Sequence, residues 1–396
     1  MTATAIRVAL FQNRVPSYRV GVFSRLGREP DLDLTVYATS YEAPIPQVES
    51  RTLVENRIGP LRIHRELFSS RFRAAHDVAL VEGRLSLLAS IALVESQLPV
   101  VWWTSLWRKD GTIGTQHGPL GLVTRRALRR ASSIVTYSRA AKEAAVRSGA
   151  PPERVFVAPN SLDTSQLLDA EASWRADPEA LARHLLQRGI DSSRAALFLG
   201  RLIPDKRLDF LVRAWALVVE RHPREAPLLV VVGDGRERSS MADLAHRLGI
   251  QGRILFLGDV RDVRRVCPFI LAARALVLPG AGGLAVNQAM THGLPTIVGG
   301  GDGTEGDVIE DGVNGFIERS GDLGEFAKRI EELLYCSDER WASYSHAARE
   351  AIRKNANLDL MIRGLAGAVR VAVGRPPAPE DSHEEPTLLE CAPGGA

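Results

Sequence analysis

Two series of short apolar runs, each alternating with helical patterns, constrain the fold of this chain most. The first series lies within residues 6–158 and the second begins at Ala195. Runs in the second series are nearly continuous in apolar residues, as expected of strands buried on both faces. Strands that alternate with helices indicate βαβ units and parallel sheets. The predicted strands are Ile6–Phe11, Leu34–Tyr37, Asp77–Glu82, Val100–Trp103, Ser133–Tyr137 and Val155–Ala158, then Ala195–Leu199, Leu228–Val232, Ile254–Leu257, Ala275–Leu278 and Thr296–Val298.

A polar, Ala-rich helical stretch over 164–190 separates the two series and marks the domain junction. We therefore predict an α/β fold of two tandem Rossmann-like, doubly wound parallel-sheet domains that face a cleft. The predicted parts are an N-terminal domain (1–172), a C-terminal domain (173–345), a helix that packs back toward the N-terminal domain (346–374) and a flexible Pro-rich tail (375–396).

Composition excludes several classes of protein. The three cysteines lie far apart and form no Cys-x-x-Cys or Cys/His cluster, which argues against a disulfide framework and a structural zinc site. The first residues lack the basic start and apolar stretch of a signal peptide. The most apolar long window, 87–103, is too interrupted to cross a bilayer. We expect a cytoplasmic protein without a transmembrane span.

Positive charge gathers in the first half of the chain. Residues 1–170 hold 22 Lys and Arg against 15 Asp and Glu, whereas the whole chain carries only +3. On a helix, Arg125 lies above Arg129 and Arg126 above Arg130. This cluster is either an ordinary solvated face or a contact for an anionic partner, such as a peripheral membrane contact. Nucleic acid is disfavoured because no recognised binding module accompanies the basic residues.

Two segments of the second series are typical of phosphate sites. Arg201 follows Gly200 at the end of a strand, and Lys206 follows at the opening of the next helix. A planar guanidinium and a point charge suit a diphosphate, although two ordinary loop cations are the alternative. Further on, a glycine turn and a helix opening over 279–290 offer free N–H groups to an anion. That turn also matches Gly-x-Gly-x-x-Ala of the dinucleotide fingerprint.

Five ordered motifs resemble those of the retaining family-4 glycosyltransferases, which have the glycosyltransferase-B fold. The motifs are Gly200-Arg201…Lys206, Val231–Gly235, Phe256–Val260, Gln288–Pro295 and Ile309–Phe316. The resemblance covers nearly the whole chain and is strongest over 195–335. It implies that Arg201 and Lys206 bind the donor diphosphate and stabilise the leaving group. It assigns the other donor contacts to Gly200, Gly258, Asp259, Val260, Gly282, Gly283, Leu284, Ala285 and Gln288.

The N-terminal half also resembles this family, and its loops would hold the acceptor. Tyr18 and Arg19 follow the first strand, while Ser105 and Trp107 follow a later one. We predict that these four residues contact the acceptor. Relatives often carry a histidine where this chain has Ser105, and His117 is the candidate that takes its place in the cleft.

The chain departs from the family at its Glu-x7-Glu motif, where Gly280 and Gln288 stand at the aligned positions. A glycine cannot contact the transferred sugar through a side chain, whereas Gln288 can still hydrogen-bond a ribose hydroxyl. The Pro-Gly-x-x-Gly-Leu variant is one associated with a subset of bacterial members. Recognition of the donor sugar must therefore be partly rebuilt.

Metal use is not expected, because the Asp31-Leu-Asp33 pattern is typical of an edge strand and the two cations can stabilise the departing diphosphate. We predict a hexosyltransferase that needs no metal or cofactor and transfers a sugar from a nucleoside-diphosphate donor. The acceptor hydroxyl would belong to a glycan, a lipid-linked glycan or a small molecule, and retention follows from the resemblance. The alternatives are a nonhydrolysing sugar-nucleotide epimerase, a nicotinamide-dependent oxidoreductase and a non-catalytic nucleotide-sugar-binding partner subunit.

Overall fold

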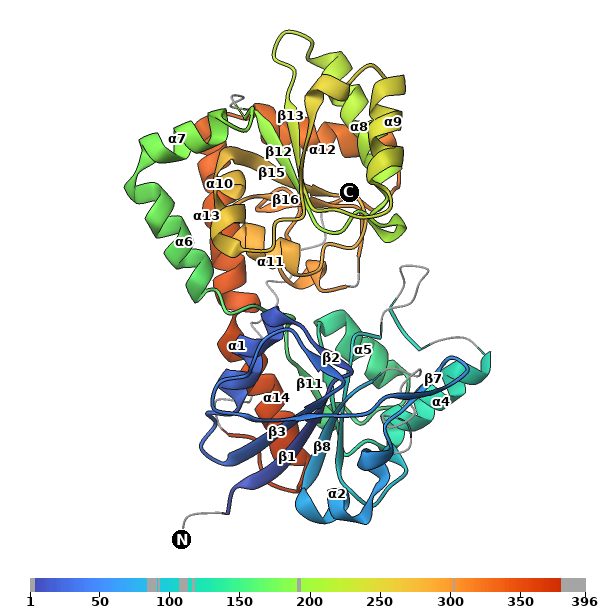
Figure 1. Ribbon diagram of the computed structural model, residues 1–396. Helices are drawn as coiled ribbons and strands as arrows, with labels where there is room; N and C mark the ends of the chain where they lie inside the picture. The colour runs from blue at the N-terminus through green and yellow to red at the C-terminus, as the bar shows by residue number, and fades with distance from the viewer. Residues whose placement is uncertain are drawn as a thin grey trace, which may run out of the picture.

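A computed structural model describes residues 4–83, 91, 93–106, 113–115, 118–190, 194–301 and 303–378. Within these residues, two α/β domains, each built around a parallel sheet, stand one above the other (Figure 1). This is the predicted pair of doubly wound domains.

The strands of both sheets are short. The first sheet contains β1 (Ile6–Phe11), β3 (Leu32–Ala38), β5 (Glu49–Thr52), β8 (Val78–Glu82), β9 (Val100–Thr104), β10 (Ser133–Thr136) and β11 (Val155–Val157). The second contains β12 (Ala195–Leu199), β13 (Leu228–Val232), β14 (Ile254–Gly258), β15 (Ala273–Leu278), β16 (Thr296–Val298) and β17 (Gly315–Ile317). Two small pairs, β2 (Arg14–Val15) with β4 (Ser40–Tyr41) and β6 (Asn56–Ile58) with β7 (Leu61–Ile63), lie outside them.

Helices cover both domains. Those of the first half are α1 (Ser17–Leu26), α2 (Ser70–Ala75), α4 (Gly118–Arg130) and α5 (Arg139–Arg147). Those of the second half are α6 (Ser165–Ala176), α7 (Pro178–Leu186), α8 (Leu208–Arg221), α9 (Arg238–Arg247), α10 (Val263–Ala272), α11 (Leu284–Thr291), α12 (Leu323–Tyr335), α13 (Asp338–Asn355) and α14 (Leu358–Ala372).

The two sheets share one topology. In the first, the order β11-β10-β9-β8-β1-β3-β5 reverses between β1 and β8, and in the second, the order β14-β13-β12-β15-β16-β17 reverses between β12 and β15. Each reversal places two loops side by side at the carboxyl ends of neighbouring strands, which is where open parallel sheets bind ligands.

Alternating side chains fix how helices cover the first sheet. Val8 and Leu10 of β1 pack with α1 and α14 on one face. Ala9 and Phe11 pack with α4 and α5 on the other. In the second domain, α8 packs against α9 and α12, α10 packs against α6, and α11 packs against α6 and α13.

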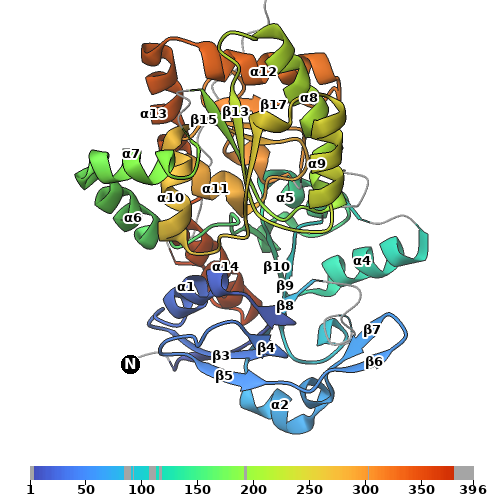
Figure 2. The same cartoon turned by 45° about the horizontal axis from the view of Figure 1, so that its top comes forward.

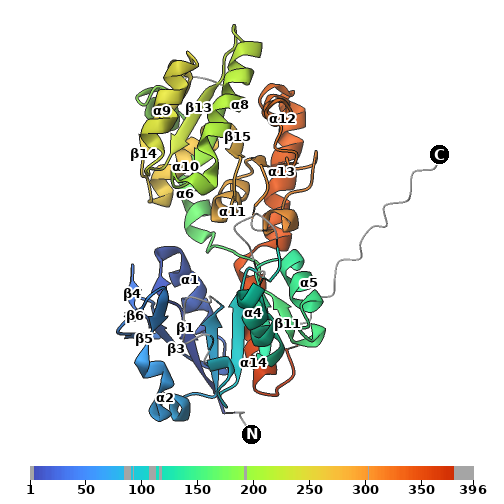
Figure 3. The same cartoon turned by 90° about the vertical axis from the view of Figure 1, so that its right-hand side faces the viewer.

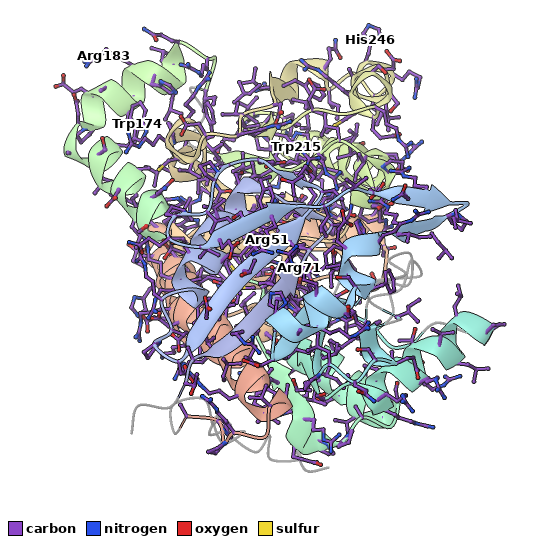
Figure 4. All side chains as sticks on the ribbon, turned by 60° about the horizontal axis from the view of Figure 1, so that its bottom comes forward. Arg51, Arg71, Trp174, Arg183, Trp215 and His246 are labelled. Atoms are coloured by element: carbon purple, nitrogen blue, oxygen red, sulfur yellow. The ribbon has the colours of Figure 1, made fainter. Side chains whose placement is uncertain are left out.

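The chain crosses between the domains twice, over 158–164 and again near 356–357, where Ser161 Oγ donates to Ala356 O at 2.6 Å. The first crossing precedes the predicted boundary at 172/173, which falls inside α6. That helix packs on the second domain because Trp174 Nε1 donates to Arg264 O of α10 at 3.0 Å (Figure 4). The other predicted boundary, 345/346, falls inside α13.

The helix α14 returns to the first domain and lies along its sheet (Figures 1 and 3). Gly364 permits a close approach, since a Cβ atom there would lie 2.3 Å from Val157 O of β11. Ser133 Oγ of β10 donates to Ala368 O at 2.7 Å, and Arg370 pairs with Asp31 at 2.8 Å. The helix α14 therefore closes the first domain although it is far away in sequence.

Candidate functional site

The candidate site lies where the second sheet reverses its order, between the loops that follow β12 and β15. Lys206 Nζ, in the first loop, donates to Ala281 O in the second. A Cβ atom at Gly280 would lie 2.2 Å from Asp205 O, so this close contact between the loops leaves no room for a side chain there. The close packing of the two loops therefore explains why a glycine, and not the glutamate of the Glu-x7-Glu motif, stands at position 280.

The two predicted diphosphate cations differ in their surroundings. Lys206 is half-buried, and its Cε lies 3.7 Å from the position of a Cβ atom on Gly200. Arg201 is exposed, and no ion pair to another described residue holds it. The structure therefore brings Gly200, Lys206 and Ala281 together, and leaves the Arg201 guanidinium on the surface of the same edge.

The glycine turn leads directly into α11, as the sequence predicts. Gly283 has a φ of 59° at the helix start, a conformation that favours glycine. The Gly282 N–H, however, donates to Glu305 Oε1 at 2.9 Å. The Gly282 N–H, which was predicted to bind the donor, is therefore already hydrogen-bonded to Glu305. Gly283, Leu284 and Ala285 form the opening of α11, as expected.

A cavity of about 650 Å³ adjoins this turn and lies between the two domains. Its glycine-rich walls come from the loops after β15 and β16, and Ile113 and Ala140 line it from the first domain. Among the residues that the structure describes, the charged side chains that line it are those of Asp205, Arg207, Glu305 and Arg319.

Arg207, Glu305 and Arg319 were missed by the sequence analysis. Arg207 has a φ of 51°, a left-handed conformation uncommon outside glycine and more frequent at functional sites. Arg319 lies just beyond the carboxyl end of β17. Because ligands bind at the carboxyl ends of parallel strands, this position could have identified Arg319 as a site residue. Nothing in the spacing of the motifs pointed to Glu305.

The residues assigned to the nucleotide lie along the same carboxyl edge. Gly258 ends β14 with a φ of 76°, and Asp259 and Val260 follow it. The Asp259 carboxylate accepts a 2.7 Å hydrogen bond from Arg261 Nε, so this acid is already paired. Gln288 is half-buried on α11.

The carboxyl edge of the first sheet differs from the prediction for Arg19. This side chain is only 3% exposed, and its guanidinium donates to Tyr137 Oη at 3.2 Å and to Asn160 Oδ1 at 3.1 Å. Its Cζ also lies 4.9 Å from the centre of the Trp103 ring. Arg19 therefore stabilises the first domain from within and does not present its charge to an acceptor.

The other acceptor candidates are only partly placed. Tyr18 is 45% exposed at the start of α1, beside buried Arg19. Ser105 is half-buried directly after β9. Trp107 and the catalytic candidate His117 lie outside the described residues.

Two hydrogen bonds join the facing edges of the domains. The Arg139 N–H at the start of α5 donates to Asp307 Oδ2 at 2.9 Å, and Asn287 Nδ2 of α11 donates to Asn160 O at 2.9 Å. Burial raises the pKa of Asp307. Asn160 thus contacts Arg19 through its side chain and the second domain through its backbone, which couples the two edges.

A buried charged cluster supports the far end of α11. Glu171 of α6 accepts hydrogen bonds from His292 Nδ1 at 2.9 Å and from Arg349 Nη2 at 2.7 Å. Burial alone would raise the pKa of Glu171, but hydrogen bonds from His292, Arg349 and Arg175 outweigh it and hold that pKa well below its usual range. These groups hold α6, α11 and α13 together and lie away from the cavity.

Neither metal ligands nor membrane helices are evident in the described part of the chain. Those residues contain no group of three or more His, Cys, Asp and Glu side chains that could hold a metal ion. Likewise, none of the helices described is both long and apolar enough to span a membrane.

Two Rossmann-like domains with facing carboxyl edges, and a cavity between them, define the glycosyltransferase-B fold. Solved proteins with this architecture include Anabaena HepE, crystallised with UDP. HepE superimposes with a TM-score of 0.70 at 18% identity over 91% of this chain and 98% of its own. A further crystal structure of HepE contains UDP-glucose and gives a TM-score of 0.68. The predicted fold is confirmed.

Residues 187–356 match the protein family described as Glycosyl transferases group 1. Similar proteins include an uncharacterized glycosyltransferase of Methanocaldococcus jannaschii, 28% identical over 42% of this chain and 41% of its own length. The D-inositol 3-phosphate glycosyltransferase of Thermobispora bispora is 29% identical over 52% of this chain and 48% of its own. The chain thus spans about half the length of these relatives.

Proposed function

We propose that this protein is a retaining, metal-independent glycosyltransferase of family 4, of the bacterial Pro-Gly-x-x-Gly-Leu variant. It would move a hexose from a nucleoside-diphosphate donor to an acceptor hydroxyl. The observation that carries the proposal is Lys206, held against the glycine turn by Ala281 O where the second sheet reverses its order. The match of residues 187–356 to a glycosyltransferase family supports it.

The chemistry requires charge stabilisation more than a protein nucleophile. As the bond between the anomeric carbon and the diphosphate oxygen breaks, negative charge gathers on the leaving diphosphate. Lys206, exposed Arg201 and the N–H groups at the start of α11 would stabilise that charge, and such preorganised groups are usually the largest contribution to catalysis. The acceptor oxygen then bonds to the same carbon from the same face, and its proton passes to the departing phosphate.

Closure of the two domains over the site would exclude water and limit hydrolysis of the donor. The hydrogen bond between Arg139 and Asp307 joins the domains beside the cavity. Ile113 and Ala140, which line that cavity from the first domain, would then cover the donor sugar. The first domain would thereby supply the acceptor side.

The donor proposed for the first test is a uridine diphosphate sugar, since HepE, which shares this fold, was crystallised with UDP and with UDP-glucose. The protein is incubated with UDP-glucose and a panel of acceptors that includes D-inositol 3-phosphate, and UDP and glycosylated product are measured. We expect UDP release that depends on an acceptor. Conversion of UDP-glucose without an acceptor would indicate an epimerase, and binding without release would indicate a non-catalytic partner.

We further propose a cytoplasmic enzyme that contacts anionic membranes through its first domain. Residues 51–75 hold six Arg and two Glu, and Arg51 and Arg71 lie on one face of this domain (Figure 4). The β6–β7 hairpin and α4 both project to the right of this domain (Figures 1 and 2). Leu122 on α4 is 63% exposed and Ile58 on the hairpin is 67% exposed, and apolar side chains beside cations suit a lipid interface.

Vesicle sedimentation tests this contact. The parent should bind vesicles that contain phosphatidylserine more than neutral vesicles, and added salt should weaken the binding. Leu122→Ser should reduce binding, whereas Leu248→Ser, at an exposed position in the second domain, should not. Equal binding by all three proteins would contradict the proposal.

A further inference from the structure

Glu305 joins the two loops that line the interdomain cavity. It is the first residue of a short 3-10 helix, Glu305–Asp307, and is only 3% exposed. Its Oε1 accepts the Gly282 N–H at 2.9 Å, and its Oε2 accepts the Gly303 N–H at 3.1 Å. One carboxylate therefore fixes the turn after β15 relative to the loop after β16.

Glycine residues make the space that this carboxylate occupies. A Cβ atom at Gly301 would lie 1.9 Å from Glu305 Oε1, so any side chain there would displace the carboxylate. Glu305 and Gly280 line the same cavity, and the other acid in its described lining is Asp205, which is exposed. A buried, oriented carboxylate thus lies in the cavity whose wall lacks a side chain at Gly280.

Carboxylates are suited to bind sugar hydroxyls because an ionised carboxyl group is acceptor-only and offers about four lone-pair sites. Hydrogen bonds to a charged acceptor are also about twice as strong as those between neutral groups. Two backbone amides hold the Glu305 carboxylate in one orientation before any ligand arrives, which lowers the entropic cost of binding.

We propose that Glu305 accepts hydrogen bonds from hydroxyl groups of the transferred hexose, and so takes over sugar recognition from the side chain that is absent at Gly280. This inference rests on the proposed function, since it names the residue that reads the donor sugar. The nucleoside diphosphate itself would bind beside Glu305, at the loop that carries Arg201 and Lys206 and at the start of α11.

The test compares two ligands that differ only by the sugar. Affinities of the parent and of Glu305→Gln for UDP-glucose and for UDP are measured by titration calorimetry. Glu305→Gln keeps the shape of the side chain but removes its charge. We expect UDP-glucose to bind about 10-fold more weakly, as for the loss of one charge-assisted hydrogen bond, while the affinity for UDP stays within about twofold of the parent.

Two further variants keep the result interpretable. Glu310→Gln makes the same substitution at an exposed position outside this cavity, and it should leave both affinities unchanged. If Glu305→Gln fails to fold, as judged by circular dichroism, Glu305→Asp retains the charge but shortens the side chain. That variant should also lose affinity for UDP-glucose selectively.

The remaining outcomes each contradict a different statement. If Glu305→Gln weakened the binding of UDP and of UDP-glucose equally, Glu305 would only position the loops. If neither affinity changed, Glu305 would neither bind the sugar nor position the loops. Either result would overturn the inference and leave the proposed function intact. If the parent bound neither ligand, the proposed uridine donor would fail, and the role of Glu305 with it.

Discussion

The two sheets reverse their strand order in the same way, yet Arg19 at the first carboxyl edge and Arg201 at the second, both assigned to a ligand from the sequence, have opposite surroundings. At the first edge, Arg19 is 3% exposed and donates to Tyr137 and Asn160. At the second, Arg201, Arg207 and Arg319 are exposed. The same topology therefore carries an internal cation in one domain and cations open to a ligand in the other.

The difference has a physical cause and a functional consequence. A buried cation is costly unless hydrogen bonds and aromatic rings replace its water, and the Tyr18, Trp103 and Tyr137 rings each lie within 5.5 Å of the Arg19 guanidinium carbon. Once replaced in this way, that charge is no longer available to an anion. The exposed guanidinium of Arg201 is thus open to an anionic ligand, whereas that of Arg19 is bound within the first domain.

Replacing Lys206 should have the largest effect of any change that tests this comparison. Without its ammonium group the departing diphosphate loses a preorganised cation, so Lys206→Ala should lower the rate of transfer by about 100-fold. Arg201→Ala should act in the same direction, and both should reduce kcat more than donor affinity.

Steady-state kinetics with UDP-glucose measure these effects. Arg213→Ala, at an exposed position of α8 on the same domain, serves as the control and should match the parent. If the activity of Lys206→Ala stayed within a few-fold of the parent, Lys206 at the carboxyl edge of the second sheet would not stabilise the leaving diphosphate.

Replacing Arg19 should give the converse result, a loss of stability with donor binding retained. Arg19→Ala leaves Asn160 Oδ1 and Tyr137 Oη without this donor, and unsatisfied buried groups should lower the free energy of unfolding by about 2 kcal/mol. Urea unfolding measures the change, and Arg25→Ala, on the same helix but more exposed, should stay within about 0.5 kcal/mol of the parent. A selective loss of acceptor binding, with stability unchanged, would instead return Arg19 to the acceptor site.

Periodicity predicted the buried strands well because their apolar runs reflect burial on both faces. It missed β5, whose four residues are all exposed at the edge of the sheet. The predicted helix over 346–374 comprises the end of α13 and the whole of α14, because Asn357 Oδ1 caps a new helix by accepting the Leu360 N–H.

The candidate site was predictable where a sequence motif marks it and not where no motif does. The Gly200–Lys206 motif and the glycine turn are each local in sequence and each follow a strand, so the sheet topology brings Lys206 and Ala281 together across 75 residues. In contrast, no motif marks Glu305, which reaches the Gly282 amide from 23 residues away. Buried Arg19 contacts Met361 Sδ of α14, 342 residues later, and no spacing of motifs encodes such a contact.

A smaller effect is expected from filling the space at Gly280. Its added methyl group would lie 2.2 Å from Asp205 O, so Gly280→Ala must push the loop that carries Lys206 away from the glycine turn. Affinity for UDP should fall about 10-fold, which corresponds to about 1.4 kcal/mol. Gly252→Ala is the matched control, because nothing lies within 4 Å of its added atom. If both variants bound UDP equally, the packing of the two loops would be irrelevant to the donor.

The smallest expected effect is that of removing divalent cations, which should be none. If Lys206 and Arg201 neutralise the leaving diphosphate, the second edge already supplies the charge that a magnesium or manganese ion would provide in a metal-dependent enzyme. Transfer measured with and without EDTA should therefore be equal. Loss of activity that magnesium or manganese restores would mean that the exposed arginines and Lys206 do not by themselves neutralise the leaving diphosphate. The cations of the second edge would then serve to bind the donor and not to catalyse transfer.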